Sequence, residues 1–114
     1  MIRRGEIYWV QLDPTIGSEI KKTRPAMIVS NNQNNEASNL ITIVPITSNT
    51  RLYGPFEVKL ENGDGGLKKP GKLTANQIRT IDKRRLVGGP LGPALSDELV
   101  NQVNHALKIH LSID

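Results

Sequence analysis

Short runs of β-branched and other apolar residues, separated by turn-forming residues, fill most of this chain and limit the folds open to it. Such runs favour strands of a pleated sheet. Residues 5–12 alternate apolar with polar side chains, and residues 40–47 are rich in isoleucine, threonine and valine. Pro45 has no N–H to donate, so we expect the far end of the latter run at an edge or bulge. The pattern predicts strands over residues 5–12, 24–30, 40–47, 56–60, 71–75 and 77–81.

The segments between these runs are polar and rich in glycine, proline and asparagine. Residues 15–23 predict a surface loop, and residues 31–39 interrupt the sheet without a clear pattern. Residues 61–66 contain Asn-Gly and Gly-Gly pairs, which favour a mobile hairpin loop. Residues 88–93 combine glycines with prolines, so we expect the sheet to end there.

One amphipathic helix is predicted at the end of the chain. Ser96 suits the N-cap, and Leu95 can pack across the cap against Val100. Apolar residues then recur at helical spacing and form one stripe that we expect to lie across the sheet: Leu99, Val103, Ala106, Leu107 and Leu111. The predicted fold is therefore mainly β with a C-terminal α-helix, a small bent sheet or partial barrel, in a single domain over residues 1–114.

Composition narrows the function further. The chain has no cysteine, which excludes a disulfide framework, a thiolate zinc site and a cysteine nucleophile. A net charge of +4 and a pI of about 9.6 favour a polyanionic partner, although simple solubility is the alternative. No segment has the continuous apolar stretch of a signal peptide or a membrane span, so we expect a cytoplasmic protein without membrane contact.

Three motifs that resemble ligand sites fail on inspection. Residues 66–72 have the spacing of a phosphate-binding loop, but Leu73 stands where the magnesium-binding hydroxyl belongs. Asp64 lies in a glycine-rich turn without the alternating carboxylates of a calcium loop. His105 and His110 are five residues apart and lie on different faces of the predicted helix. We therefore expect no metal, no cofactor and no chemistry that depends on histidine.

Polar residues where predicted strands start or stop are the remaining candidates for chemistry. They are Ser18, Glu19, Arg24, Thr47, Ser48, Asn76, Gln77 and Arg79. Aromatic residues are few, which leaves Tyr8, Trp9, Tyr53 and Phe56 as the stacking platforms for nucleic-acid bases. The basic residues Lys21, Lys22, Lys68, Lys69 and Lys72 lie in or beside two loops, where they either follow an RNA backbone or are solvated surface charge.

Several blocks, in one order along the chain, resemble the MazF/PemK (Kid) family of toxin endoribonucleases. They are RGEIY at 4–8, LDP at 12–14, GSE at 17–19, TRP at 23–25, PITS at 45–48 and QIRTID at 77–82. The resemblance implies a small barrel-like sheet related to SH3 folds and a homodimer. It also implies sequence-specific cleavage of single-stranded mRNA, which inhibits translation, and neutralisation by an acidic antitoxin protein.

The resemblance also assigns roles to particular residues. The family's catalytic arginine and threonine match Arg24 and Thr47. The implied reaction needs no metal: a ribose 2′-hydroxyl attacks its own phosphodiester and leaves a 2′,3′-cyclic phosphate. Glu19 is the nearest candidate for the proton acceptor. RNA-binding roles are expected for Ser18, Glu19, Lys21, Lys22, Ser48, Lys72, Asn76, Gln77 and Arg79.

Departures from the family leave two alternatives open. PemK-type members have a histidine at the position of Ser18 and an Arg-x-Asp pair at Thr74 and Asn76, so their acid and base do not transfer. A toxin of the same fold that poisons DNA gyrase is one alternative, although the only tryptophan here is Trp9 and not a C-terminal one. The other is a non-catalytic RNA-binding or antitoxin-binding module in which Arg24 only grips phosphate.

Overall fold

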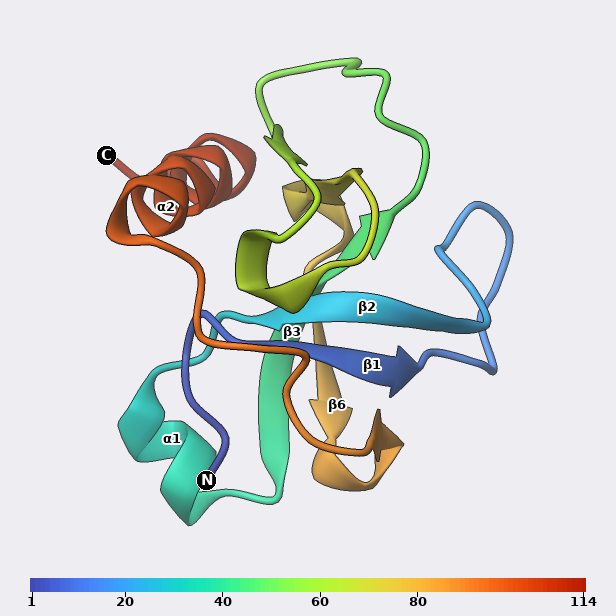
Figure 1. The fold of residues 1–114 in the computed structure, drawn as a ribbon, viewed down its shortest axis with the longest axis vertical. Helices are drawn as coiled ribbons and strands as arrows, with labels where there is room; N and C mark the ends of the chain where they lie inside the picture. The colour runs from blue at the N-terminus through green and yellow to red at the C-terminus, as the bar shows by residue number, and fades with distance from the viewer.

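A computed structural model describes residues 1–114. Its main elements are seven short strands and a C-terminal helix (Figure 1). The strands are β1 (Ile7–Gln11), β2 (Thr23–Ile28), β3 (Leu40–Thr47), β4 (Glu57–Leu60), β5 (Gly71–Thr74), β6 (Arg79–Asp82) and β7 (Leu86–Val87). Helix α1 spans Asn32–Ala37 and α2 spans Asp97–Leu111. Short 3-10 helices cover Asp64–Gly66, Ala75–Gln77 and Lys83–Arg85. The predicted β-rich class with one terminal helix is confirmed.

Strand β3 is the centre of the sheet, whose order is β4-β5-β3-β2-β1-β7 with antiparallel pairing. The first half of β3 pairs with β6 and its last two residues pair with β5. Pro45 lies between these two segments and faces Ala26 of β2. The expectation of an edge or bulge is therefore wrong in detail, because the N–H that Pro45 lacks falls where β3 stops pairing with β6 and begins to pair with β5. Figure 1 shows β1 and β2 running across β6 and the first part of β3, so the sheet is strongly bent.

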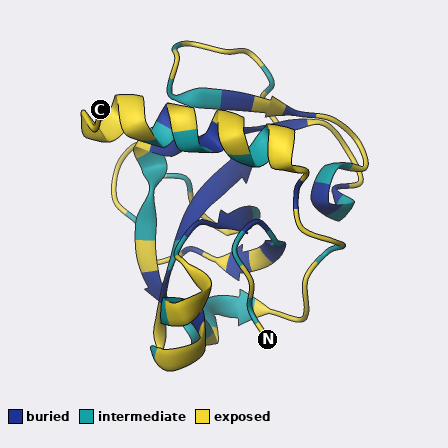
Figure 2. Cartoon of the chain, turned by 90° about the vertical axis from the view of Figure 1, so that its left-hand side faces the viewer, coloured by how far each residue is buried: buried dark blue, intermediate teal, exposed yellow.

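Two buried clusters lie on opposite faces of the bent sheet, as alternation along β1 requires. Ile7 belongs to the cluster under α2, with Val103 and Ala106 of that helix. Tyr8 and Val10 belong to the second cluster, which the inward residues of β2, β3 and β6 complete. Figure 2 shows α2 with buried positions toward the sheet and exposed ones outward. The packed core thus fixes the positions of the start of β2 and the end of β3.

The caps and connections differ partly from expectation. Ser96 caps α2 as predicted, and its hydroxyl accepts a hydrogen bond from Leu99 N at 3.3 Å. Leu111 is wrongly assigned to the packed stripe, because it is exposed where the helix extends past the sheet. Residues 31–39 contain helix α1 (Asn32–Ala37), which the asparagine-rich sequence did not indicate. Neither α1 nor α2 combines the length and apolar surface that crossing a bilayer would need.

The hairpin between β4 and β5 has an anchored loop. Its 3-10 helix places Leu67 in the core. A Cβ added at Gly65, where φ is +59°, would meet Ile7 Cδ1 at 2.6 Å. The glycine pair therefore serves close packing as well as turn formation. Similarly, the strand expected from Gln77 begins only at Arg79, since Ala75–Gln77 form a 3-10 helix.

Candidate active site and RNA groove

Arg24 and Thr47 come from neighbouring antiparallel strands at the same end of the sheet. Ala26 of β2 faces Pro45 of β3. Two positions from this pair, toward the start of β2 and the end of β3, lie Arg24 and Thr47. Both line one hollow of about 220 Å³, which they share with Ser48, Lys69 and Trp9, among others. The sheet register alone thus brings together two residues that are far apart in the sequence.

The hydrogen bonds of these two side chains leave the terminal nitrogens of Arg24 and the lone pairs of the Thr47 hydroxyl available to a ligand. Arg24 Nε donates to the Lys21 carbonyl at 3.2 Å, while its two terminal nitrogens have no acceptor within the protein. Thr47 Oγ1 donates to the Asn49 carbonyl at 3.2 Å. A guanidinium with two free parallel donors suits the bidentate recognition of a phosphate.

A glycine lets strand β5 approach the end of β3 closely. A Cβ at Gly71 would lie 2.7 Å from the Thr47 carbonyl oxygen. Gly71 and the preceding Lys69 and Pro70 therefore form one wall of the Arg24–Thr47 hollow. Lys69, which was expected only as one of several loop lysines, is the lysine that lines this hollow.

Two further hollows extend the first into a groove. The second shares Thr47 with the first and is also lined by Ser18, Tyr53, Asn76 and Gln77. The third, of about 230 Å³, shares Ile20, Asn76 and Gln77 with the second and adds Glu19 and Arg79. In Figure 1 the loops of residues 12–22 and 48–56 both rise at the end of the sheet where β2 begins and β3 ends. We call these three adjoining hollows the groove, and most of the predicted site residues line it.

Three predicted residues anchor loops in addition to lining the groove. Glu19 Oε1 accepts a hydrogen bond from Ile16 N at 2.6 Å, and Glu19 does not reach the hollow of Arg24 and Thr47. The structure therefore does not support Glu19 as the proton acceptor. Gln77 Oε1 accepts from Ile20 N at 3.2 Å, and Arg79 Nη1 donates to the Leu12 carbonyl at 2.8 Å. Both contacts hold the loop that follows β1.

The lysines before β2 lie outside the groove. Lys21 and Lys22 are exposed, and neither lines the three hollows. Lys22 has a positive φ of 70°, and its backbone N–H donates to Asp13 Oδ2 at 3.2 Å. The structure thus shows their backbone in a turn that leads into Arg24, with their ammonium groups in solvent.

Lys72, one of the lysines expected in or beside the loops, has a buried side chain. Its side chain is only 6% exposed, and its Nζ lies 2.7 Å from Glu57 Oε2, which is 4% exposed. The same ammonium donates to the Arg51 carbonyl at 2.6 Å. Lys72 lies in β5, within the strand that the sequence predicts over residues 71–75, but no local pattern indicates its partner Glu57. A charge that is buried and already neutralised is unsuited to phosphate binding.

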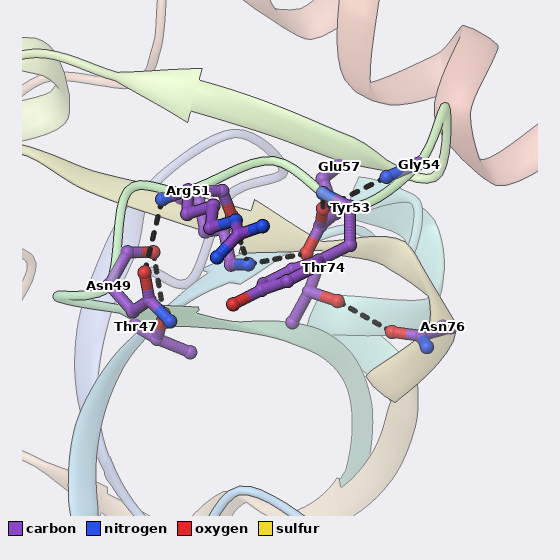
Figure 3. Close-up of polar contacts among 9 residues, drawn as sticks. Thr47, Asn49, Arg51, Tyr53, Gly54, Glu57, Thr74 and Asn76 are labelled. Carbon is purple, nitrogen blue, oxygen red and sulfur yellow. Dashed lines mark hydrogen bonds and ion pairs between the residues drawn. The ribbon is translucent and has the colours of Figure 1, made fainter.

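A neutral hydrogen bond stands where the PemK-type pattern has Arg-x-Asp. Thr74 Oγ1 donates to Asn76 Oδ1 at 2.5 Å, beside the groove (Figure 3). Neither group is charged, so the pair supplies neither an acid nor a base near pH 7. No cluster of three or more histidine, aspartate or glutamate side chains is placed to share a metal ion.

The Glu57–Lys72 pair predicts a specific loss of stability in acid. Burial alone raises the pKa of Glu57, but hydrogen bonds from Lys72 and from the Tyr53 and Gly54 N–H groups outweigh it and lower the pKa below its ordinary value. A carboxyl with a lowered folded-state pKa stabilises the fold above its unfolded pKa of about 4.3, and this stabilisation is lost as pH falls through the folded pKa.

We therefore expect the free energy of unfolding of the wild-type protein to fall more steeply than that of Glu57→Gln between about pH 5 and about pH 3. Urea titrations across this range measure both slopes. Parallel slopes would show that Glu57 contributes nothing to the acid response.

Comparisons with known proteins agree on one family. Residues 3–111 match the model of the PemK-like, MazF-like toxins of type II toxin–antitoxin systems. The endoribonuclease MazF9 of Mycobacterium tuberculosis is 43% identical, over 99% of this chain and 98% of its own. A mycobacterial endoribonuclease solved in complex with its cognate antitoxin is 29% identical and has a TM-score of 0.81, with 100% of this chain and 98% of that one covered. MazF of Deinococcus radiodurans is 27% identical, with a TM-score of 0.83 over 97% and 96% of the two chains.

Proposed function

The chain belongs to the PemK-like, MazF-like family of type II toxins, and we propose that it is a toxin endoribonuclease that cleaves single-stranded mRNA without a metal ion and so inhibits translation. The observation that carries the proposal is the shared hollow of Arg24 and Thr47 at the end of β2 and β3. The whole of residues 1–114 acts as one toxin domain in this proposal.

The proposed reaction is an internal transfer at phosphorus. The O2′ of a ribose forms a bond to the adjacent phosphorus while the bond from phosphorus to O5′ of the next nucleotide breaks. The 2′-hydroxyl loses its proton, and the leaving O5′ gains one. The products are a 2′,3′-cyclic phosphate and a 5′-hydroxyl, so neither water nor a cofactor enters this step.

Arg24 and Thr47 meet the electrostatic demand of that transfer. Negative charge increases on the non-bridging oxygens as O2′ attacks, and the two free terminal nitrogens of Arg24 can bind both oxygens at once. The Thr47 hydroxyl needs only to rotate away from the Asn49 carbonyl to bond the phosphate or the attacking ribose. A guanidinium remains protonated, so Arg24 neutralises charge and accepts no proton.

The groove on either side of this hollow suits a single strand. Ser48 and Lys69 flank the proposed scissile phosphate, and Ser18, Asn76 and Gln77 line the neighbouring hollow. Hydroxyl and amide groups of this kind can bond base edges that a duplex would hide. RNA contacts at these side chains and at Glu19 and Arg79 are part of the proposal, whereas Lys72 is left out.

Partner and location follow from the family. We infer a cytoplasmic homodimer that an acidic antitoxin neutralises. The net charge of +4 supports an acidic partner, and the mycobacterial endoribonuclease of similar fold is solved with its cognate antitoxin.

The test is direct. Purified protein is incubated with single-stranded RNA in excess EDTA, and fragment ends are identified by mass spectrometry. The same oligomer with 2′-O-methyl riboses is the matched control, because it lacks the attacking hydroxyl. Cyclic-phosphate ends from the first substrate and none from the second support the proposal.

Two outcomes would contradict it. Cleavage of the methylated oligomer would exclude attack by the 2′-hydroxyl. Intact RNA across varied sequences would favour the gyrase-poisoning or non-catalytic alternatives, which a gyrase supercoiling assay and an RNA-binding assay then separate.

A further inference from the structure

Tyr53 is the most exposed aromatic side chain of the groove. It is 62% exposed, whereas Tyr8 is buried and Phe56 packs against the core. Tyr53 belongs to the connection between β3 and β4, which has no regular structure. An exposed ring on such a segment usually adopts several orientations. The Tyr53 ring, in contrast, is held in one orientation by several contacts.

The backbone around Tyr53 is tied to a buried carboxylate. The N–H groups of Tyr53 and Gly54 donate to Glu57 Oε1 at 2.5 and 3.3 Å (Figure 3). Glu57 is itself held by Lys72, and both side chains are almost wholly buried. The buried ion pair of the β4–β5 hairpin therefore anchors the loop around Tyr53.

The ring is also held by two cations. Lys72 Nζ lies 4.4 Å from the centre of the Tyr53 ring, and Arg51 Cζ lies 5.2 Å from it. Both distances are within the range of cation–π attraction. Figure 3 shows the Arg51 guanidinium over the Tyr53 ring, with Thr74 and Asn76 close by. The orientation of the ring is thus set before any ligand arrives.

The position of this ring relates it to the proposed chemistry. Tyr53 lines the same hollow as Thr47, and Thr47 also borders the hollow of Arg24. Asn76 and Gln77 of that hollow use their amide oxygens within the protein, in bonds with Thr74 and Ile20. Their NH₂ groups remain as donors for acceptor atoms on a base edge.

We propose that Tyr53 is the stacking platform for a nucleobase next to the scissile phosphate, and that the buried Lys72–Glu57 pair is the support that holds it. The inference rests on the proposed endoribonuclease function and adds a base-binding residue to it. A planar, oriented ring suits any base face, and prior orientation reduces the entropy lost on binding.

An abasic scan tests this pairing. The cleavage site is mapped first, and the RNA is then synthesised with a 2′-deoxyribose at that nucleotide, so that it binds without being cut. A series carries one abasic residue at each neighbouring position. Fluorescence anisotropy gives Kd for wild-type protein, Tyr53→Ala and Tyr53→Phe, with Leu52→Ala as the control because Leu52 is a comparably exposed neighbour (50%) in the same loop.

Tyr53→Ala is expected to raise Kd about ten-fold or more, as loss of one base–aromatic stack predicts. Tyr53→Phe and Leu52→Ala should bind like the wild type. One abasic position should weaken binding to the wild-type protein and leave binding to Tyr53→Ala unchanged. Equal responses to every abasic position, or a loss in Tyr53→Phe as large as in Tyr53→Ala, would overturn the inference.

The scan separates this inference from the proposed function. Cleavage by the wild type with no effect of Tyr53→Ala removes the platform and leaves the nuclease. Binding without cleavage removes the nuclease; no nucleotide then needs a 2′-deoxyribose, and the abasic scan on the bound, unmodified oligomer still decides whether Tyr53 stacks on a base. Protein that neither binds nor cuts RNA overturns both.

Discussion

Replacing Arg24 with alanine is expected to lower kcat for RNA cleavage by about 10²–10³-fold, the usual effect of removing one preorganised charge-stabilising group. The structure gives the reason: the terminal nitrogens of Arg24 have no acceptor within the protein and line the hollow that Thr47 shares. The phosphate carries more charge in the transition state than in the bound substrate. The loss should therefore fall mainly on kcat and less on KM. Steady-state kinetics on a short RNA measure both.

Three further variants make this expectation specific. Arg24→Lys keeps the charge but loses the bidentate geometry, so it should recover only part of the rate. Thr47→Val keeps the shape and removes the hydroxyl, and should also slow cleavage. Arg84→Ala is the control, since Arg84 pairs with Asp82 and lines none of the three groove hollows. Wild-type rates in folded Arg24→Ala would refute the site, and a change confined to KM would reduce Arg24 to a binding residue.

The strands that carry this site could be predicted from the sequence, because alternation and β-branching report local burial directly. Leu40–Thr47 is found over the predicted range. Arg24 and Thr47 were assigned by family resemblance, and only the register of β2 against β3 explains why they share a hollow. Register depends on contacts between strands, which no local pattern contains.

Which hydrogen bonds and ion pairs a side chain makes could not be predicted from the sequence, whether its partner is near or far along the chain. The strand predicted over residues 71–75 contains Lys72, but only the pairing of β4 with β5 reveals Glu57 on the same face. Glu19 was a reasonable base by proximity along the chain, yet its carboxylate is used within its own loop. Helix α1 was missed because asparagine has a weak helix propensity, whereas Asn31 is an effective cap.

The buried pair provides the other large effect. Lys72→Met is expected to lower the free energy of unfolding by about 3 kcal/mol, because it leaves the Glu57 carboxylate buried without its counter-charge. This is a substantial part of the stability of a domain of this size. Urea denaturation followed by circular dichroism measures the change. Lys59→Met is the matched control: Lys59 faces Lys72 in the hairpin register, and its own pair with Glu61 is exposed and 3.7 Å long. It should cost well under about 1 kcal/mol.

A double variant distinguishes a supporting ion pair from a lysine that contacts RNA. Glu57→Gln combined with Lys72→Met removes both buried charges, so its loss of stability should be smaller than that of Lys72→Met alone. If the Lys72–Glu57 pair holds Tyr53 in place, Lys72→Met should lower the affinity for RNA as well as the free energy of unfolding. Unchanged stability together with a lower salt dependence of RNA binding would instead mean that the Lys72 ammonium meets phosphate. In that case the sequence-based assignment of Lys72 would be right, and its pair with Glu57 would contribute nothing to the stability of the fold.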